Sequence, residues 1–202
     1  MQQSKIQLSE EEMQLVRNKG WILTKQKITA GVYDIFGGVS EKMQQWVQNN
    51  KTIPAAINHL SAKISKGEQY ESLPYVVLDY PRYFSREDVF AIRTFFWWGN
   101  YFTSTLHIKG RYKDELIKKI RSAITMGKFD NCYLSLTGNE FDFNVEGSSY
   151  QLIQKENHQA MAAAMVRASF IKISTRISFD EWNRSGEMLW ESFQSYMTVS
   201  WA

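Results

Sequence analysis

The sequence has little of what most functional signatures require. Its 202 residues include a single cysteine and three prolines, and 24 basic side chains nearly balance 21 acidic ones. The lone Cys132 excludes an internal disulfide, and a formal net charge of +3 is too small to mark a surface for a polyanion. No apolar run approaches the ~20 residues that a membrane span needs. Neither nucleic acid nor a membrane is therefore an expected partner.

The motifs by which many enzymes are identified are also missing. The chain contains no Gly-x-Gly-x-x-Gly, no phosphate loop ending in Gly-Lys-Ser/Thr, no Gly-x-Ser-x-Gly, no His-Glu-x-x-His and no Cys-x-x-Cys. The histidines His59, His107 and His158 fall on separate predicted elements without the spacing of metal ligands. We therefore expect no metal and no cofactor, and we expect Cys132 to be an inert buried thiol with a raised pKa.

The N-terminal part, residues 1–68, is predicted to be helical. Its opening residues MQQSKIQLSEEE lack the charged and then apolar order of a secretory signal, so the expected location is the cytoplasm. Apolar residues three and four apart predict a long helix over 21–49. The next helix is predicted from Pro54 to near Gly67. Gly37 and Gly38 lie inside the long helix, where we expect either a closely packed neighbour or a break.

The centre of the chain, residues 73–153, is predicted to form a sheet with a ββαββ core. Gly99-Asn100 predicts a two-residue turn between the strands of a hairpin over 90–109, in which Trp98 lies opposite Tyr101. Gly138-Asn139 predicts a second hairpin over 132–145. An amphipathic helix over 113–125 separates the two.

Residues 154–199 are predicted to form C-terminal helices, one over 156–172 and one that begins after a capping box of Ser178 and Glu181. The predicted fold is a single α+β domain over 1–202, with a mostly antiparallel sheet of four to six strands packed against the helices. The last helix carries more apolar residues than one core-facing stripe requires. It is therefore either buried nearly all round or in contact with a partner, for which a homo-oligomer is the commonest form.

Aromatic residues are concentrated between Tyr70 and Phe102, where they make up twelve of thirty-three residues. Most are expected to fill the core, but both faces of the first hairpin carry them, and a face without a helical cover would expose an apolar patch. On this reading the candidate ligand-binding residues are Phe96, Trp98, Tyr101 and Arg82. The function favoured by this pattern is a non-catalytic binding or interaction module for an apolar or aromatic small ligand or a partner protein.

Three ionisable residues in the same region suggest an alternative. Arg93 shares its predicted face with Phe95 and Trp97, where an unpaired guanidinium is too costly, so it requires a carboxylate or a ligand anion. Asp79 is the carboxylate favoured as its partner. If instead Arg93 bound a small anionic substrate, His107 would exchange a proton and the chain would be an enzyme. The absence of a nucleophile or metal motif favours the non-catalytic interpretation.

The segments LPYVVLDYPRYF and FFWWGNYF resemble a group of uncharacterised bacterial soluble proteins. The resemblance extends from Leu73 to Gly110 only. It implies a bacterial, cytosolic origin, and it brings no activity, cofactor or catalytic residue to this sequence.

Overall fold

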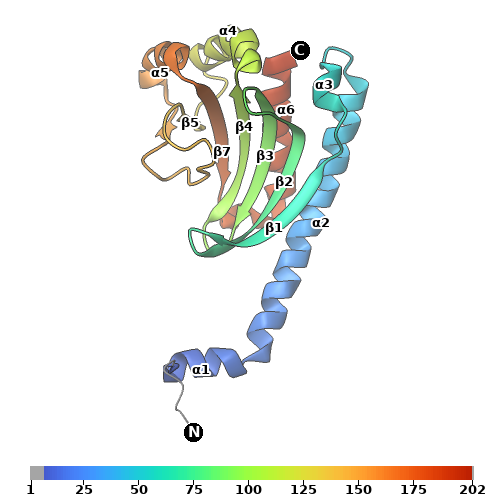
Figure 1. Cartoon of the computed structure of the whole chain (residues 1–202), viewed down its shortest axis with the longest axis vertical. Helices are drawn as coiled ribbons and strands as arrows, with labels where there is room; N and C mark the ends of the chain where they lie inside the picture. The colour runs from blue at the N-terminus through green and yellow to red at the C-terminus, as the bar shows by residue number, and fades with distance from the viewer. Residues whose placement is uncertain (1–6, 202) are drawn as a thin grey trace.

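A computed structural model describes residues 7–201 of the chain, and a seven-stranded antiparallel sheet forms its centre (Figure 1). The strands lie in the order β1-β2-β3-β4-β7-β5-β6. Their bounds are β1 Lys63–Tyr70, β2 Leu73–Phe84, β3 Val89–Trp97, β4 Tyr101–Lys109, β5 Tyr133–Ser135, β6 Gln151–Leu152 and β7 Phe170–Ile177. The α+β class and the antiparallel sheet are confirmed, but the expected four to six strands were too few.

Six α-helices accompany the sheet: α1 Glu10–Arg17, α2 Lys19–Asn49, α3 Ala55–Asn58, α4 Arg111–Thr125, α5 His158–Ala164 and α6 Ser185–Trp201. Three short 3-10 turns add η1 Lys155–Asn157, η2 Met165–Arg167 and η3 Phe179–Arg184. Figure 1 shows α6 behind the sheet, α2 along its β1 edge, and α4 and α5 at one end. The main core lies between one face of the sheet and these helices.

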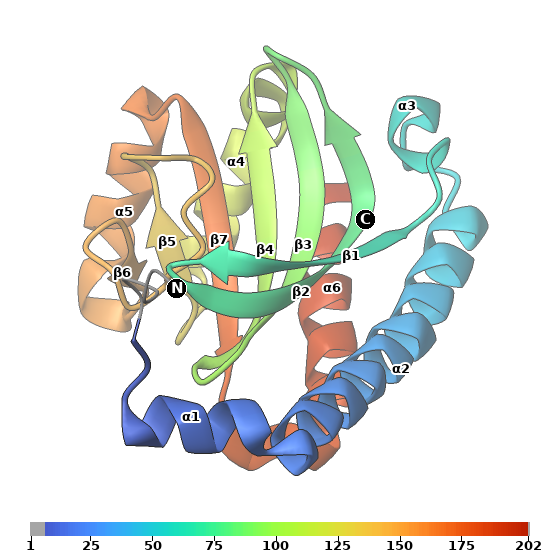
Figure 2. The same ribbon diagram turned by 60° about the horizontal axis from the view of Figure 1, so that its bottom comes forward.

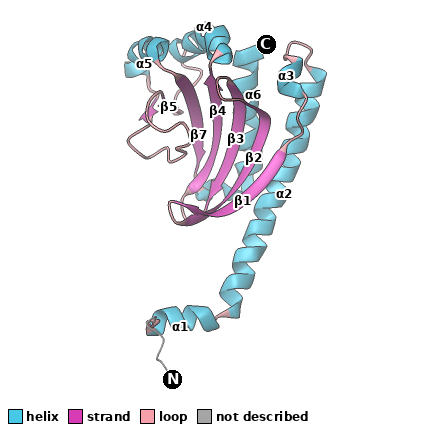
Figure 3. Ribbon diagram, in the orientation of Figure 1, coloured by secondary structure: helices cyan, strands magenta, loops and turns pink. Residues whose placement is uncertain are grey.

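The opposite face of the sheet has no helical cover. Residues 136–150 fold over it as a loop beside β7 (Figure 3). Phe143, Val145 and Tyr150 from this loop pack on the sheet in a second, smaller core of mostly aromatic residues. The two faces of the sheet therefore have different covers: helices on one, and an irregular loop on the other.

The first hairpin forms as predicted, but with a different register. Trp97 lies opposite Tyr101, so the loop has three residues, with Gly99 at φ +76°. This shift by one residue moves every β4 side chain to the face opposite the one predicted, because side chains alternate along a strand. Arg93 consequently shares its face with Tyr101 and His107 instead of Phe102 and Leu106.

The C-terminal parts of two predicted helices are strands. Residues 63–70 pair with β2, and residues 170–177 lie between β4 and β5, where they form a central strand of the sheet. The segment over 156–172 therefore begins as helix α5, passes through η2 and ends in β7. In both places long-range pairing outweighs the local helical spacing on which the prediction rested.

The predicted second hairpin is also wrong. Only Tyr133–Ser135 of its first arm is a strand, and its partner is β6 instead of residues 140–145. Hydroxyl groups of tyrosines in the sheet bind the backbone of the predicted second arm and hold it as a loop. Tyr70 accepts a hydrogen bond from the backbone N–H of Phe143 at 2.7 Å, and Tyr101 accepts one from that of Val145 at 3.1 Å.

The long helix and the last helix behave differently from the expectations placed on them. α2 runs unbroken through Gly37 and Gly38, and a Cβ added at either would meet nothing within 4 Å, so neither a close neighbour nor a break explains the glycines. The additional apolar residues of α6 pack within the chain, against α2, α4 and β4. The Ser178 side chain caps η3 by accepting from the N–H of Asp180. The predicted reciprocal bond, in which the Glu181 carboxylate would accept from the N–H of Ser178, is not formed.

Candidate functional site

The loop-covered face of the sheet carries an unusual set of buried polar side chains. Antiparallel register places Asp79 opposite Arg93, and His107 opposite Lys172. Asp79 is 7% exposed, His107 5% and Lys172 0%. Because burial of a charge is costly, each of these groups must be paired, hydrogen-bonded or neutral.

Arg93 and Asp79 form the ion pair predicted from the sequence. The Arg93 Nε donates to Asp79 Oδ1 at 2.7 Å, and Nη2 donates to Oδ2 at 2.8 Å. This two-pronged contact matches the planar guanidinium to the carboxylate. The guanidinium also lies over the ring of Phe143, with its carbon 4.8 Å from the centroid, so the covering loop contributes to its environment.

Burial disfavours the charged forms of His107 and Lys172. Burial, and after it the neighbouring charge of Lys172, lower the pKa of His107 to about 4, so the imidazole is neutral at pH 7. Burial also lowers the pKa of Lys172 to about 7. Its ammonium donates to the backbone carbonyl of Asp142 and lies 4.2 Å from the centroid of Phe143.

A cavity of about 330 Å³ opens beside this cluster. Its walls are formed by residues of β2, the β2–β3 connection, β3, β4 and the covering loop: Phe84, Ser85, Arg86, Val89, Arg93, His107, Lys109, Glu140 and Phe141. The Glu140 carboxylate accepts from Lys109 Nζ at 2.8 Å, and its other oxygen is 3.3 Å from His107 Nε2. The geometry of that second contact is not a hydrogen bond, so both atoms remain buried without a hydrogen-bond partner.

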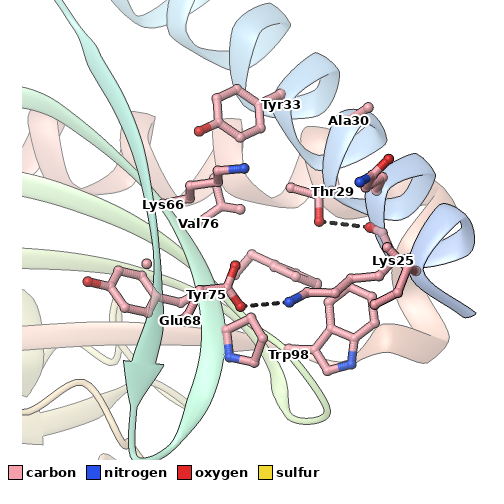
Figure 4. Close-up of a pocket in the computed structure, with 14 residues that line it drawn as sticks. Lys25, Thr29, Ala30, Tyr33, Lys66, Glu68, Tyr75, Val76 and Trp98 are labelled. Carbon is pink, nitrogen blue, oxygen red and sulfur yellow. Dashed lines mark hydrogen bonds and ion pairs between the residues drawn. The ribbon is translucent and has the colours of Figure 1, made fainter. Parts of the chain in front are cut away.

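Another cavity is a groove of about 490 Å³ between the first half of α2 and the end of the sheet. Figure 4 shows α2 on one side, contributing Lys25, Thr29 and Tyr33, and the β1–β2 strands with Trp98 on the other. Phe96 and Val76 form part of its wall. We call this cavity the α2 groove.

The α2 groove combines apolar walls with a polar rim. At one end, Lys25 Nζ bonds Glu68 Oε2 at 2.6 Å, an ion pair that joins residues far apart in the sequence. Trp21 meets Trp98 edge to face, with ring centroids 6.3 Å apart. Trp21 remains 43% exposed and its neighbour Ile22 49%. Apolar surface therefore continues from the groove onto the exposed start of α2.

The four ligand-binding candidates do not come together. Phe96 and Trp98 both line the α2 groove, although Phe96 is largely buried in the main core. Tyr101 lies on the opposite face, where its hydroxyl donates to Asn144 at 3.0 Å. Arg82 lies apart from both, with its Nε bonded to the carbonyl of Ser61. Among these residues, Trp98 is the one that contributes a partly exposed ring to a cavity.

The three catalytic candidates, by contrast, lie close to one another. Arg93 and His107 line the same cavity, and Asp79 bonds Arg93. Arg93 is thus both paired with the carboxylate and adjacent to open space. Cys132 is largely buried, and burial raises the pKa of its thiol as expected.

Sequence reasoning missed Glu140 and Lys109 at this cavity, Lys172 opposite His107, and all of the α2 side of the groove. A signal for Lys172 was present: in FIKISTRI, isoleucines and polar residues alternate with the period of a strand. That alternation places Lys172, Ser174 and Arg176 on one face. The α2 groove had no comparable signal, because it joins segments more than thirty residues apart.

Within residues 7–201, no group of three His, Cys, Asp or Glu side chains is placed to hold a metal ion. No helix of the same residues is both long and apolar enough to cross a membrane. Compared with known proteins, the chain matches no protein-family model, no curated protein and no solved structure.

Proposed function

We propose that this protein is a non-catalytic interaction module, and that the α2 groove and the apolar surface beside it bind a partner protein. The observation that carries the proposal is the partly exposed Trp98, which lines the groove of about 490 Å³ and contacts Trp21 at the start of α2. Aromatic residues at the centre of an apolar patch with a polar rim are typical of binding surfaces.

A protein partner is favoured over a small molecule by the extent of the surface. Ile22 lines the groove and is 49% exposed, and beside it Trp21 and Leu23, which do not line the groove, are 43% and 63% exposed. These three consecutive residues point in different directions around a helix, so one small ligand in the groove would leave most of them in water. A protein partner large enough to contact more than one side of α2 would cover all three.

The groove can be tested with a neutral apolar probe, N-phenyl-1-naphthylamine, whose fluorescence rises in an apolar site. The probe stands in for the apolar side chains of a partner. Trp98→Ala removes a ring from the wall of the groove and is expected to weaken probe binding at least fivefold. Phe141→Ala, which removes a ring that is 60% exposed beside the other cavity, is the control and is expected to bind the probe like the parent.

Unchanged probe binding by the Trp98→Ala variant would overturn the proposal. Circular dichroism of both variants confirms that each is folded, because Trp98 also packs against Phe96 in the main core. A variant that fails to fold is replaced by Trp98→Phe. That variant retains a ring in the core contact but shortens the groove wall, and it is expected to show a smaller loss of binding.

A second candidate function is favoured by the cavity beside His107. Three cationic side chains, from Arg86, Arg93 and Lys109, line it together with apolar rings, which suits a small carboxylate with an apolar body. With a pKa of about 4, His107 is neutral at pH 7, so its imidazole is free to accept a proton, although as a weaker base than an ordinary histidine. An enzyme that acts on such an anion would therefore use it as a base.

Benzoate is a suitable probe for this second candidate. Its binding is expected to shift the amide NMR signals of β4 and the covering loop, and Arg86→Gln is expected to weaken binding several-fold. Lys118→Gln, which removes an exposed charge on α4, is the control. Absence of any shift at millimolar benzoate would exclude the anion site while leaving the α2 groove unaffected.

A further inference from the structure

The N-terminal helices form an arm that projects from the body of the molecule. We define the arm as residues 8–27, which comprise α1 and the start of α2; Figures 1 and 2 show α1 lying clear of the sheet. Within residues 7–201 eleven large hydrophobic side chains are exposed, and six of them belong to the arm. These six are Leu8, Leu15, Val16, Trp21, Ile22 and Leu23.

The helix α1 has no packing of its own to hold it. It contains 8 residues, and none of them is buried against the rest of the described chain. A helix shorter than about 12 residues is marginal in water without tertiary contacts, and the capping box of Ser9 and Glu12 supplies only local stabilisation. An amphipathic helix of this length therefore needs a surface to pack against.

The charges of the arm divide into two opposite halves. The first turn of α1 carries Glu10, Glu11 and Glu12 against a single basic residue, Arg17, in its last turn, whereas residues 19–27 carry three lysines and no acidic residue. The acidic turn does not suit an anionic lipid surface, on which interfacial helices carry lysine and arginine. A partner that complements this arm must present a basic segment to α1 and an acidic one to the start of α2.

A second copy of the same arm meets this requirement. At 1.5 Å per residue, α1 is about 12 Å long and residues 19–27 span about 13.5 Å, so the two halves match in length. We propose that two copies of the chain pair through their arms about a twofold axis near Asn18, with α1 of each copy along residues 19–27 of the other. This inference rests on the proposed function, since it names the partner of that surface, and such self-complementary pairing is typical of homodimers.

Charge reversal on the two halves gives a direct test. Variant A carries Glu10→Lys and Glu11→Lys, which leaves the capping box of Glu12 intact. Variant B carries Lys19→Glu and Lys27→Glu, which leaves the Lys25–Glu68 ion pair intact. In light scattering we expect the parent to be a dimer, each variant alone to dissociate at a concentration at least tenfold higher, and an equimolar mixture of A and B to dimerise like the parent.

The mixture distinguishes a second copy from any other partner, because only pairing between arms restores opposite charges across the contact. A mixture that stays monomeric overturns the inference. A parent that is monomeric at high concentration also overturns it. Binding of the neutral apolar probe to that monomer would leave the proposed function standing, whereas loss of both dimer and probe binding would remove both.

The apolar part of the contact has its own matched pair of variants. Leu15→Asp places a charge on the arm where the side chain is 51% exposed, and Val166→Asp does so in η2, where it is 53% exposed. We expect Leu15→Asp to yield a monomer and Val166→Asp to remain a dimer. Two variants that both remain dimers would show that the arm is not the contact, and would overturn the inference.

Discussion

At the scale of single residues, the cost of burying charge governs the loop-covered face. Arg93, His107 and Lys172 lie on adjacent strands of this face, yet only Asp79, Glu140 and the carbonyl of Asp142 oppose them. The arginine remains charged in its two-pronged pair, whereas burial lowers the pKa of both other groups. Removal of one charge should therefore affect its neighbours as well as its partner.

The ion pair of Arg93 and Asp79 gives the first prediction. Arg93→Met leaves Asp79 almost buried and unpaired, and should lower the free energy of unfolding by about 2–3 kcal/mol, less than for a fully buried pair because the arginine side chain is 23% exposed. Arg93→Met combined with Asp79→Leu should recover much of this loss. Urea titrations of the parent, both single variants and the double variant measure the coupling. Additive losses would show that the two side chains do not stabilise each other.

Lys172 gives a prediction about pH. Its pKa is about 7 in the folded protein and 10.5 in an unfolded chain, so between these values the unfolded state binds more protons. Raising the pH from 7 to 9.5 should therefore stabilise the fold, by up to about 1.4 kcal/mol per pH unit. Lys172→Met should remove this rise, which urea titrations at several pH values measure. Lys118→Met, at an exposed site, is the control; an unchanged slope in the Lys172 variant would contradict the assignment.

The residues of the candidate sites could be predicted only in part. The pairing of Arg93 with Asp79 followed from chemistry alone, because a guanidinium among apolar residues requires a carboxylate. The position of His107 beside Arg93 did not follow, since it depends on a hairpin loop of three residues instead of two. Lys172 was missed because its segment was assigned to a helix, and register determines which side chains share a face.

At the scale of elements, prediction succeeded where local signals agree with the final packing. The helix over 19–49, the strands of the first hairpin and α4 have strong periodicity and clear turn or cap residues. The prediction missed β1, because its sequence KISKGEQY is mostly polar and becomes a strand only through pairing with β2. The predicted strand over 140–145 was wrong for a related reason. The alternation of apolar and polar residues there suits a strand, but tyrosine hydroxyls on the sheet accept hydrogen bonds from its backbone instead.

The glycines inside α2 give a prediction at this scale. Gly37 and Gly38 lie in helical backbone, and an added Cβ at either position meets nothing within 4 Å. Each change to alanine should therefore raise the free energy of unfolding by about 1 kcal/mol, through the higher helix propensity of alanine. Thermal and urea unfolding measure the gain. Gly110→Ala is the opposite control and should lower stability, because the φ of +59° at Gly110 and the nearby carbonyl of Glu87 exclude a side chain. A loss of stability on changing Gly37 or Gly38 to alanine would contradict the prediction and would mean that another molecule packs against α2 there.

At the scale of the whole molecule, apolar surface is distributed unevenly. The sequence placed the excess on the last helix, but α6 packs within the chain against α2, α4 and β4. The body therefore has two covered sheet faces, and most of the exposed large hydrophobic side chains lie on the arm. The arm could not be identified from the sequence, because α1 and α2 both look like ordinary amphipathic helices. Only the absence of a packing partner in the fold distinguishes their first turns.

Pairing of arms implies a last prediction about hydrogen exchange. At a protein concentration well below that of dimer formation, the amides of α1 should exchange quickly, because an unpacked helix of 8 residues opens readily. At high concentration they should become protected, since α1 then lies on the second copy. The amides of α4, which is anchored in the main core by Leu116, Ile120 and Ile124, provide the internal control and should exchange equally at both concentrations. Mass spectrometry after pulse labelling measures both helices in one sample, and protection of α1 that does not change with concentration would mean that the helix is stabilised within one chain.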